Sequence, residues 1–235
     1  KLRQNLSMAG NKISICIAGK NQCAIDALKY LILNYKKNYN ILALPNKNDK
    51  GIDTWQKSFK KFAISKNIKI INLKKLYTIK NLYLFSIEYE NILKIEKFNS
   101  SNLFNIHFSL LPKYKGCHTN FYQIYYGEKY SGVSLHKIDS GIDTGPLISQ
   151  ISFEVPLNST AYENYLKLMK YSVIIFKKNL KRILNNEYNL KKQNSKKGSY
   201  FNRESVNYKE LININKIDNK IKTHNLIRSL IFKPF

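Results

Sequence analysis

Short apolar runs alternate with segments of helical periodicity along the N-terminal part of the chain. Continuous apolar runs predict strands buried on both faces, whereas apolar residues spaced three and four apart predict helices. The predicted strands are Lys12–Ala18, Asn40–Leu44, Ile68–Leu73 and Leu82–Ile87, with Asn105–His107 on or just after a fifth, and the predicted helices are Ala24–Tyr35 and Asp53–Lys66. Strands that alternate with helices indicate an α/β fold built on a Rossmann-type, mostly parallel sheet.

The second half of the chain has a different pattern. Gly132–His136 and Leu147–Phe153 predict two further strands, and Thr160 with Glu163 has the spacing of a capping box at the start of a long helix ending near Leu184. After Asn185 the chain becomes polar, which predicts an exposed hairpin or irregular connector over Tyr188–Tyr200 and then a tail. We therefore expect a catalytic domain over residues 11–185 and a short C-terminal extension over residues 186–235.

The formal net charge of +25 over 235 residues raises the question of a nucleic-acid partner. The basic residues are mostly lysines scattered among Asn and Ile, and no Arg-rich block or nucleic-acid motif accompanies them. We therefore expect no functional nucleic-acid partner, although a basic nucleic-acid-binding protein remains the alternative from another class. The same positive field would attract small anionic substrates.

Other features of the sequence concern the compartment. The three cysteines, Cys16, Cys23 and Cys117, form no C-x-x-C pair, which predicts neither a disulfide framework nor a metal site. No apolar run is long enough for a membrane helix, and the polar segment Lys1–Gly10 does not have the pattern of a secretory signal. These features favour a reduced, cytoplasmic protein without a membrane partner.

The segment Phe104–Gln150 carries most of the candidate chemistry. Asn105 and His107 alternate on a strand, so their side chains lie on one face, and Asp143 follows on a glycine-flanked loop. Acyl transfer to an amine requires hydrogen-bond donors for an oxyanion and a group of tunable pKa for the amine proton. A carboxylate beside a histidine raises the histidine pKa and fixes its tautomer. Asn105, His107 and Asp143 therefore form a candidate catalytic set.

The order of these residues, with the Ser-Leu-Leu-Pro and Tyr-Lys-Gly loops between them, resembles the active-site signature of formyltransferases that use 10-formyltetrahydrofolate. The resemblance implies the formyltransferase fold, a catalytic role for Asn105, His107 and Asp143, and no metal. It also implies folate contacts from Phe85, Ser86, Ile87, Glu88 and Asp139. Phe108 departs from the pattern, because many members have proline there, which puts the geometry on the folate side in question.

Three branches of that family differ in their acceptor. Methionyl-tRNA formyltransferases carry a larger C-terminal domain than the residues after Tyr200 could form, and glycinamide ribonucleotide enzymes end near the long helix. Both stay as alternatives. The short extension and the sequence Lys115–Phe121 resemble the nucleotide-sugar branch most, in particular enzymes acting on dTDP-4-amino-4,6-dideoxyglucose. That branch implies a homodimer and a product used in O-antigen or other surface polysaccharide. Candidate contacts to the nucleotide sugar are Lys20, Asn21, His118, Asn120 and Tyr200.

Overall fold

The computed structural model describes residues 12–208, 212, 217 and 219–233. The chain forms two compact units, residues 1–104 and residues 105–235. Strand β5 (Asn102–His107) begins in the first unit and ends in the second. Residues 186–235, expected to form an extension, belong to the same compact unit as residues 105–185. That 11–185 is an independent domain stays a prediction.

The first unit is a parallel sheet with helices, and its strand order is β3-β2-β1-β4. Its elements are β1 (Ser14–Gly19), α1 (Asn21–Tyr35), β2 (Asn40–Pro45), α2 (Phe59–Ser65), β3 (Lys69–Ile70), α3 (Leu73–Tyr77), β4 (Leu82–Ile87) and η1 (Ile95–Lys97). Strand β1 is parallel to both β2 and β4, and Cys16 stands between Leu42 and Leu84 in register. The fully buried apolar residues of β1 and β4 confirm the predicted α/β fold with a mostly parallel sheet.

Two predictions in the first unit are wrong in their extent. Helix α2 begins at Phe59 rather than at Asp53, because the preceding residues form a turn in which the Asp53 carboxylate accepts a hydrogen bond from Ser58 N (2.9 Å). Strand β3 is only two residues long, and helix α3 follows at once with the Asn72 side chain as its N-cap. The apolar run Ile68–Leu73 therefore supplies a short edge strand and the beginning of a helix.

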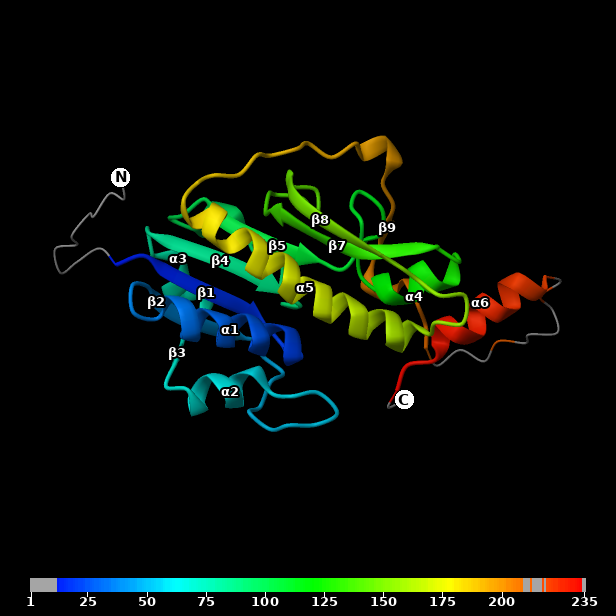
Figure 1. Ribbon diagram of the computed structural model, residues 1–235, viewed down its shortest axis with the longest axis horizontal. Coiled ribbons are helices and arrows are strands. Elements are labelled where there is room, and N and C mark those ends of the chain that lie inside the picture. Colours follow the sequence, from blue (N-terminus) through cyan, green and yellow to red (C-terminus); the bar gives the residue numbers. More distant parts are fainter. Residues whose placement is uncertain (1–11, 209–211, 213–216, 218, 234–235) are drawn as a thin grey trace. The chain divides into compact units, whose positions relative to one another are not determined.

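The second unit contains the C-terminal part of β5, the strands β7 and β8 that continue the sheet from it, and a separate two-stranded sheet, together with α-helices and short 3-10 helices. Its elements are β6 (Lys115–Gly116), α4 (Thr119–Tyr125), β7 (Tyr130–Lys137), β8 (Leu147–Glu154), α5 (Ala161–Leu184), η2 (Ser195–Lys197), β9 (Tyr200–Phe201), η3 (Arg203–Ser205) and α6 (Lys220–Leu230). The strand order is β5-β7-β8, with β7 and β8 antiparallel and an irregularity between Leu135 and His136. Figure 1 shows α5 crossing β7 and β8, and α6 beside α4.

The long helix α5 begins as predicted. Thr160 Oγ1 accepts a hydrogen bond from Glu163 N, and the Glu163 carboxylate accepts one from Thr160 N. These reciprocal bonds satisfy two of the four amide groups that a helix start leaves without partners. The buried face of α5 includes Tyr165, Leu168 and Phe176, so this face of the helix is part of the core.

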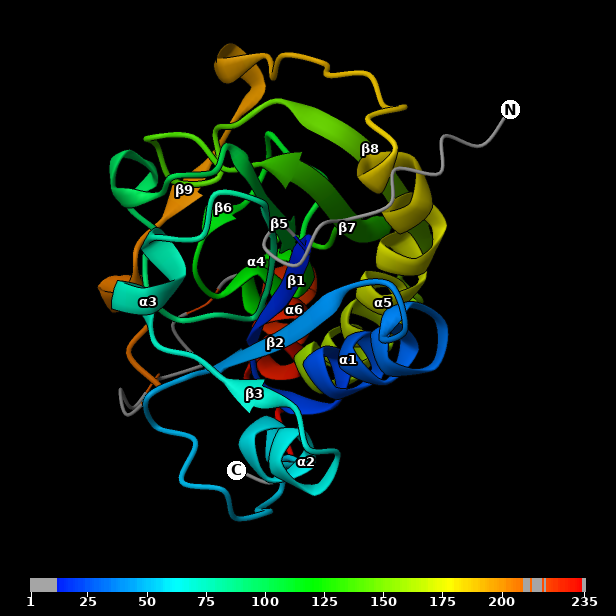
Figure 2. The same ribbon diagram turned by 90° about the vertical axis from the view of Figure 1, so that its left-hand side faces the viewer.

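The connector, defined here as Lys191–Phe201, is not a hairpin. It runs from the end of α5 back across the second unit and ends in β9, which pairs with β6 in a two-stranded parallel sheet (Figures 1 and 2). The prediction of an irregular connector is confirmed, and the alternative of a hairpin is wrong. The short pairing joins residues that lie far apart in the chain, so no local pattern marks it.

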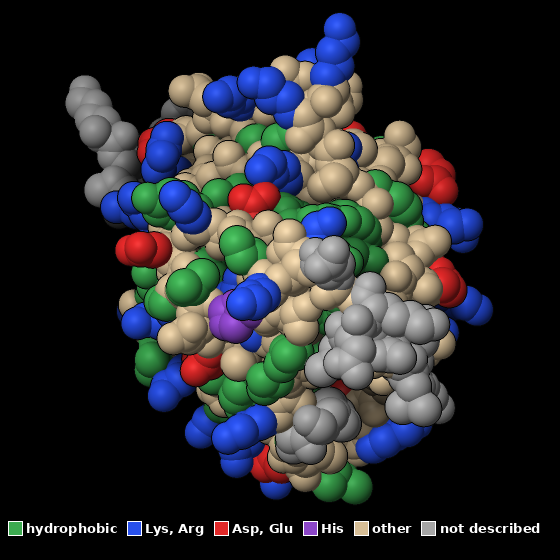
Figure 3. Space-filling view, turned by 90° about the vertical axis from the view of Figure 1, so that its right-hand side faces the viewer, with side chains coloured by type: hydrophobic (Ala, Val, Ile, Leu, Met, Phe, Trp, Pro, Cys, Tyr) green, Lys and Arg blue, Asp and Glu red, His purple; other side chains and the backbone are tan. Residues whose placement is uncertain are grey.

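The surface and the cysteines complete the description. Figure 3 shows Lys and Arg side chains spread over one face, singly and in small groups, between hydrophobic and other side chains. Within the described part of the chain, no helix combines the length and the apolar character needed to cross a membrane. Cys16 and Cys23 are buried, and burial raises the pKa of both thiols. Cys117 is half-buried.

Candidate active site

Strand β5 brings Asn105 and His107 to one face of the second unit. Phe104 and Ile106, which alternate with them, are buried in the core and fix the direction in which the polar side chains point. After β5, the Ser-Leu-Leu-Pro loop is held by Ser134, whose hydroxyl donates to Ser109 O and accepts from Leu111 N (2.6 and 3.0 Å). The loop returns the chain to β6 beside the site.

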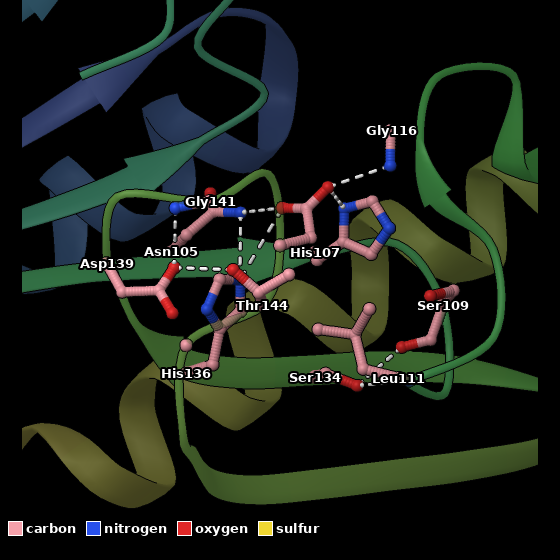
Figure 4. A network of polar contacts seen from close by, with 12 residues as sticks. Asn105, His107, Ser109, Leu111, Gly116, Ser134, His136, Asp139, Gly141 and Thr144 are labelled. Carbon is pink, nitrogen blue, oxygen red and sulfur yellow. Dashed lines mark hydrogen bonds and ion pairs between the residues drawn. The ribbon is translucent and has the colours of Figure 1, made fainter. Parts of the chain in front are cut away.

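Asp143 lies at the centre of the polar network. Its Oδ1 accepts a hydrogen bond from Asn105 Nδ2 (3.1 Å) and lies 3.6 Å from His136 Nε2. Its Oδ2 accepts one from Gly116 N (2.9 Å) and lies 3.4 Å from His107 Nδ1. Figure 4 shows these groups converging on one carboxylate from both sides. The structure thus brings together the three residues predicted to be catalytic.

The environment of Asp143 keeps it ionised. Burial, which leaves the side chain 12% exposed, by itself raises the pKa of the carboxyl. The charge of His107, the hydrogen bond from His136 and the Gly116 amide outweigh burial and hold the pKa of Asp143 well below its usual range. At neutral pH the site therefore contains a fixed negative charge.

Main-chain carbonyls determine which nitrogen of each histidine carries hydrogen. His107 Nε2 lies 2.6 Å from Tyr114 O, and His136 Nδ1 lies 2.7 Å from Lys137 O. Because a carbonyl oxygen only accepts, both of these nitrogens donate. His136 Nε2 lies 3.2 Å from Asn105 Nδ2 and 3.6 Å from Asp143 Oδ1. The Asn105 amide nitrogen is thus placed between Asp143 and His136, and its hydrogen bond to Asp143 fixes the orientation of the side chain.

His136 is a member of this network that the sequence analysis did not single out. It is 2% exposed on β7 and contacts both Asn105 and Asp143. Its place on a strand just before the Asp143 loop was a usable signal. A polar side chain at a buried strand position that precedes a glycine-flanked loop points to the same end of the sheet as that loop.

The comparisons with known proteins agree with this geometry. A family model described as formyl transferase matches residues 84–179. An N-formyltransferase from Helicobacter canadensis, solved with folinic acid and dTDP-3-aminofucose, is 45% identical with a TM-score of 0.88, covering 94% of this chain and 81% of that one. WlaRD, described as a sugar 3N-formyl transferase and solved with dTDP and 5-N-formyl-THF, is 48% identical with a TM-score of 0.89, covering 95% and 81%.

This chain belongs to the formyltransferase family. Among curated proteins, the bifunctional polymyxin resistance protein ArnA of Wigglesworthia glossinidia brevipalpis is 39% identical over 155 residues, which is 66% of this chain and 23% of that protein. The chain spans between 23% and 64% of the length of the first three curated relatives. The predicted formyltransferase resemblance and fold are confirmed.

The residues of this formyltransferase predicted to contact folate lie in both units. In the first unit, Phe85, Ser86 and Ile87 are buried at the end of β4, and Glu88 follows with a positive φ of 60°. Asn46, which the sequence analysis did not name, holds this segment by donating to Glu88 O and accepting from Glu90 N (3.1 and 3.2 Å).

Asp139, the folate candidate in the second unit, shapes the catalytic loop. Its Oδ1 accepts hydrogen bonds from Thr144 Oγ1 and Gly141 N (2.7 and 3.2 Å), so it organises the turn that leads to Asp143. A side chain at Gly141 would place Cβ 2.1 Å from Thr144 Oγ1, which explains the glycine there. A folate contact from Asp139 stays a prediction.

The residues of this formyltransferase predicted to bind the nucleotide sugar differ in exposure and in the contacts that they make within the protein. Lys20 lies 3.9 Å from Glu88 in an ion pair of the first unit, and Asn21 is buried at the start of α1. His118 Nε2 donates to Arg203 O (2.7 Å), and its Nδ1 accepts from the Tyr208 hydroxyl (3.0 Å), so both ring nitrogens are used within the protein. Tyr200 is 53% exposed on β9.

Asn120 lies half-buried in the first turn of α4, a short helix that the pattern of the sequence did not predict. A metal centre of three or more His, Cys, Asp or Glu side chains is absent from the described ranges. The polar set around Asp143, namely an amide, two imidazoles and a carboxylate, contains the residue types that formyl transfer to an amine requires.

Proposed function

We propose that this formyltransferase transfers a formyl group to the amine of a dTDP-linked amino-dideoxy sugar. The observation that carries the proposal is the ionised Asp143, held between Asn105 and His107 on one side of the second unit. The two solved relatives at 45% and 48% identity are described with dTDP or a dTDP-amino sugar and with formyl- or folinic-type folates, which supports this acceptor and donor.

When bound, 10-formyltetrahydrofolate supplies the formyl group and the leaving nitrogen. Asp143, whose pKa lies well below its usual range, is a poor proton acceptor near neutral pH. We therefore assign proton exchange with the amine to His107, and we assign Asp143 the electrostatic task of stabilising positive charge on that ring, 3.4 Å away. The hydrogen bond from Asn105 Nδ2 to Asp143 fixes the orientation of the Asn105 amide, so its Oδ1 is the atom that it presents to an amine.

The position of the amine is open between two sugar classes. The sequence alone favoured dTDP-4-amino-4,6-dideoxyglucose. The relatives at 45% and 48% identity are described with dTDP-3-aminofucose and as a sugar 3N-formyl transferase, whereas a 4-N formyltransferase from Francisella tularensis is 23% identical. We therefore propose a dTDP-3-amino-dideoxy sugar as the acceptor, with a formamido sugar for surface polysaccharide as the product. A cytoplasmic location and a homodimer stay predictions.

A formyl-transfer assay with paired acceptors tests the proposal. The acceptors are dTDP-3-amino and dTDP-4-amino-dideoxy sugars of matched stereochemistry, the UDP-linked forms, glycinamide ribonucleotide and Met-tRNA. We expect turnover with a dTDP-3-amino sugar at least about 10-fold above its 4-amino partner. Preference for the 4-amino partner would restore the expectation from sequence. Turnover only with Met-tRNA or the ribonucleotide would overturn the proposal of a sugar acceptor.

A further inference from the structure

The connector is bonded to both loops that hold the Asp143 carboxylate. Lys191 and Leu147 exchange two main-chain hydrogen bonds of 2.8 Å, just after the Asp143 loop. On the other side, Lys115 N donates to Ser199 O (2.9 Å) and Cys117 N donates to Phe201 O (2.8 Å). These two amides flank Gly116, whose own N–H is the one that donates to Asp143 Oδ2.

Gln193 fastens the connector to the main chain of Asp143 itself. Its Nε2 donates to Asp143 O (2.9 Å) and to Gly145 O (2.7 Å), so one amide group holds the loop at two points. The backbone of the loop between these points is conformationally restricted. Asp143 has a φ of 53°, a conformation unfavourable for a residue with a side chain, and a Cβ at Gly145 would lie 1.8 Å from Lys137 O.

The polar atoms of Gln193 argue against a role in stability alone. Its Oε1 is buried and meets no donor within the described part of the chain. An unsatisfied buried acceptor opposes the stabilisation that the two hydrogen bonds from Nε2 contribute. The side chain therefore holds the loop at a cost in folding free energy, which favours a role in positioning.

We propose that Gln193 is a positioning residue for the reaction, a proposal that rests on the formyl transfer proposed above. By holding the carbonyls of Asp143 and Gly145, it keeps the strained loop in the one arrangement in which the carboxylate meets Asn105, His107 and Gly116 together. The segment after α5 is thereby part of the active-site framework, although no residue in it touches the carboxylate.

Loss of this hold has a specific chemical consequence. Without the Gln193 donors the Asp143 backbone can relax out of its positive φ, and the carboxylate then moves relative to the rings and amide that it aligns. A displacement of about 1 Å in a catalytic arrangement can lower the rate about 100-fold. Substrate binding depends on other contacts and is affected less.

The test uses two substitutions and a matched control. Gln193→Met keeps the approximate volume and removes both the donor and the unsatisfied oxygen. Gln193→Glu keeps the shape but turns an acceptor-only carboxylate toward two carbonyls. Lys192→Gln alters an exposed neighbour in the same connector and is the control. We expect kcat to fall about 10- to 100-fold for both Gln193 variants, with KM for the amino sugar within about 3-fold and Tm within a few degrees of wild type.

Hydrogen exchange supplies a readout that needs no substrate. The amides of residues 143–145 and 147 should exchange faster in Gln193→Met than in wild type or in Lys192→Gln. Unchanged exchange and kcat in Gln193→Met would overturn the proposal, and so would a loss of kcat that merely follows an equal loss of Tm in both variants. If wild-type protein formylates no amino sugar, the proposed function fails, while the exchange experiment still decides whether Gln193 positions the loop.

Discussion

At the scale of single residues, the site is organised around one carboxylate with four polar neighbours. Two of them, Asn105 and Gly116, donate hydrogen bonds, and two, His107 and His136, are rings whose other nitrogens donate to carbonyls. This arrangement explains the low pKa of Asp143 and fixes the Asn105 amide. Each neighbour limits what the others can do, so changes at this cluster should not add independently.

Substitution of Asp143 should separate the effect of the carboxylate charge on activity from the effect of the side-chain shape. Asp143→Asn keeps the size of the side chain but removes the charge that faces His107 (3.4 Å). We expect kcat for formyl transfer to fall at least about 100-fold, since removal of one preorganised electrostatic group has effects of this size. Asn105→Ala and His107→Ala should also lose most turnover while folding normally. Wild-type activity in all three variants would show that the site lies elsewhere.

The same carboxylate predicts a pH dependence of stability. A carboxyl whose pKa is lowered in the folded state contributes stability above its unfolded pKa of about 3.9, and loses it as pH falls through the folded value. The free energy of unfolding of wild type should therefore exceed that of Asp143→Asn at pH 6. The difference should shrink as pH falls below about 4. Urea unfolding of both proteins at several pH values measures it, and a pH-independent difference would contradict the low pKa.

Single residues also show which parts of the site the sequence could predict and which it could not. Asn105, His107 and Asp143 were predictable because a short motif and a glycine-flanked loop mark them. His118 carried the same kind of signal, yet both of its nitrogens bond the tail, at Arg203 and Tyr208. A sequence identifies a residue type that can bind a ligand, but the partner that it meets depends on distant segments of the chain.

At the scale of elements, helix ends and strand runs were the predictable part. The buried runs of β1 and β4 and the capping box of α5 have local causes, and each lies where its pattern indicates. Helix α2 begins at Phe59, later than predicted, because the preceding residues form a turn around Asp53. The pairing of β6 with β9 has no local cause and could not be predicted.

The capping box of α5 predicts a local loss of stability without a loss of function. Thr160→Ala removes the hydroxyl that accepts from Glu163 N (3.2 Å) and should cost about 1 kcal/mol of unfolding free energy. Thr160→Ser keeps the acceptor and serves as the control. Chemical denaturation measures both variants, with formyl transfer as a check that the site is unaffected. Equal losses in the Ala and Ser variants would contradict a capping role.

At the scale of the whole molecule, the C-terminal residues are integrated into the second unit. Arg228, 5% exposed on α6, donates to Ser159 O (2.9 Å) and Ile124 O (3.3 Å), and burial lowers its pKa. Asn225 Oδ1 accepts two further bonds from the same guanidinium. Carbonyl oxygens, including one at the C-terminal end of α4, thus stabilise a buried positive charge.

Removal of this guanidinium should loosen α6 from α4. Arg228→Ala leaves Ser159 O without the donor that Arg228 supplies, at a cost of about 1–3 kcal/mol for an unsatisfied buried acceptor. Ile124 O loses one donor and still accepts from Gly127 N (3.0 Å). We expect a lower unfolding free energy and faster hydrogen exchange in α6. Arg228→Lys keeps the charge but cannot span the same acceptors, so it should be intermediate. Wild-type exchange in Arg228→Ala would contradict the role of Arg228 in holding α6.

The pairing of β6 with β9 has a consequence for the order of events during synthesis. Tyr114 N donates to Ser199 Oγ across 85 residues of sequence, and the neighbouring Gly116 amide is the one that meets Asp143. A ribosome that has released α5 has already delivered Asn105, His107 and Asp143, but not the strand that sets Gly116. Because contacts distant in sequence form late, the arrangement around Asp143 is completed only after β9 has been made.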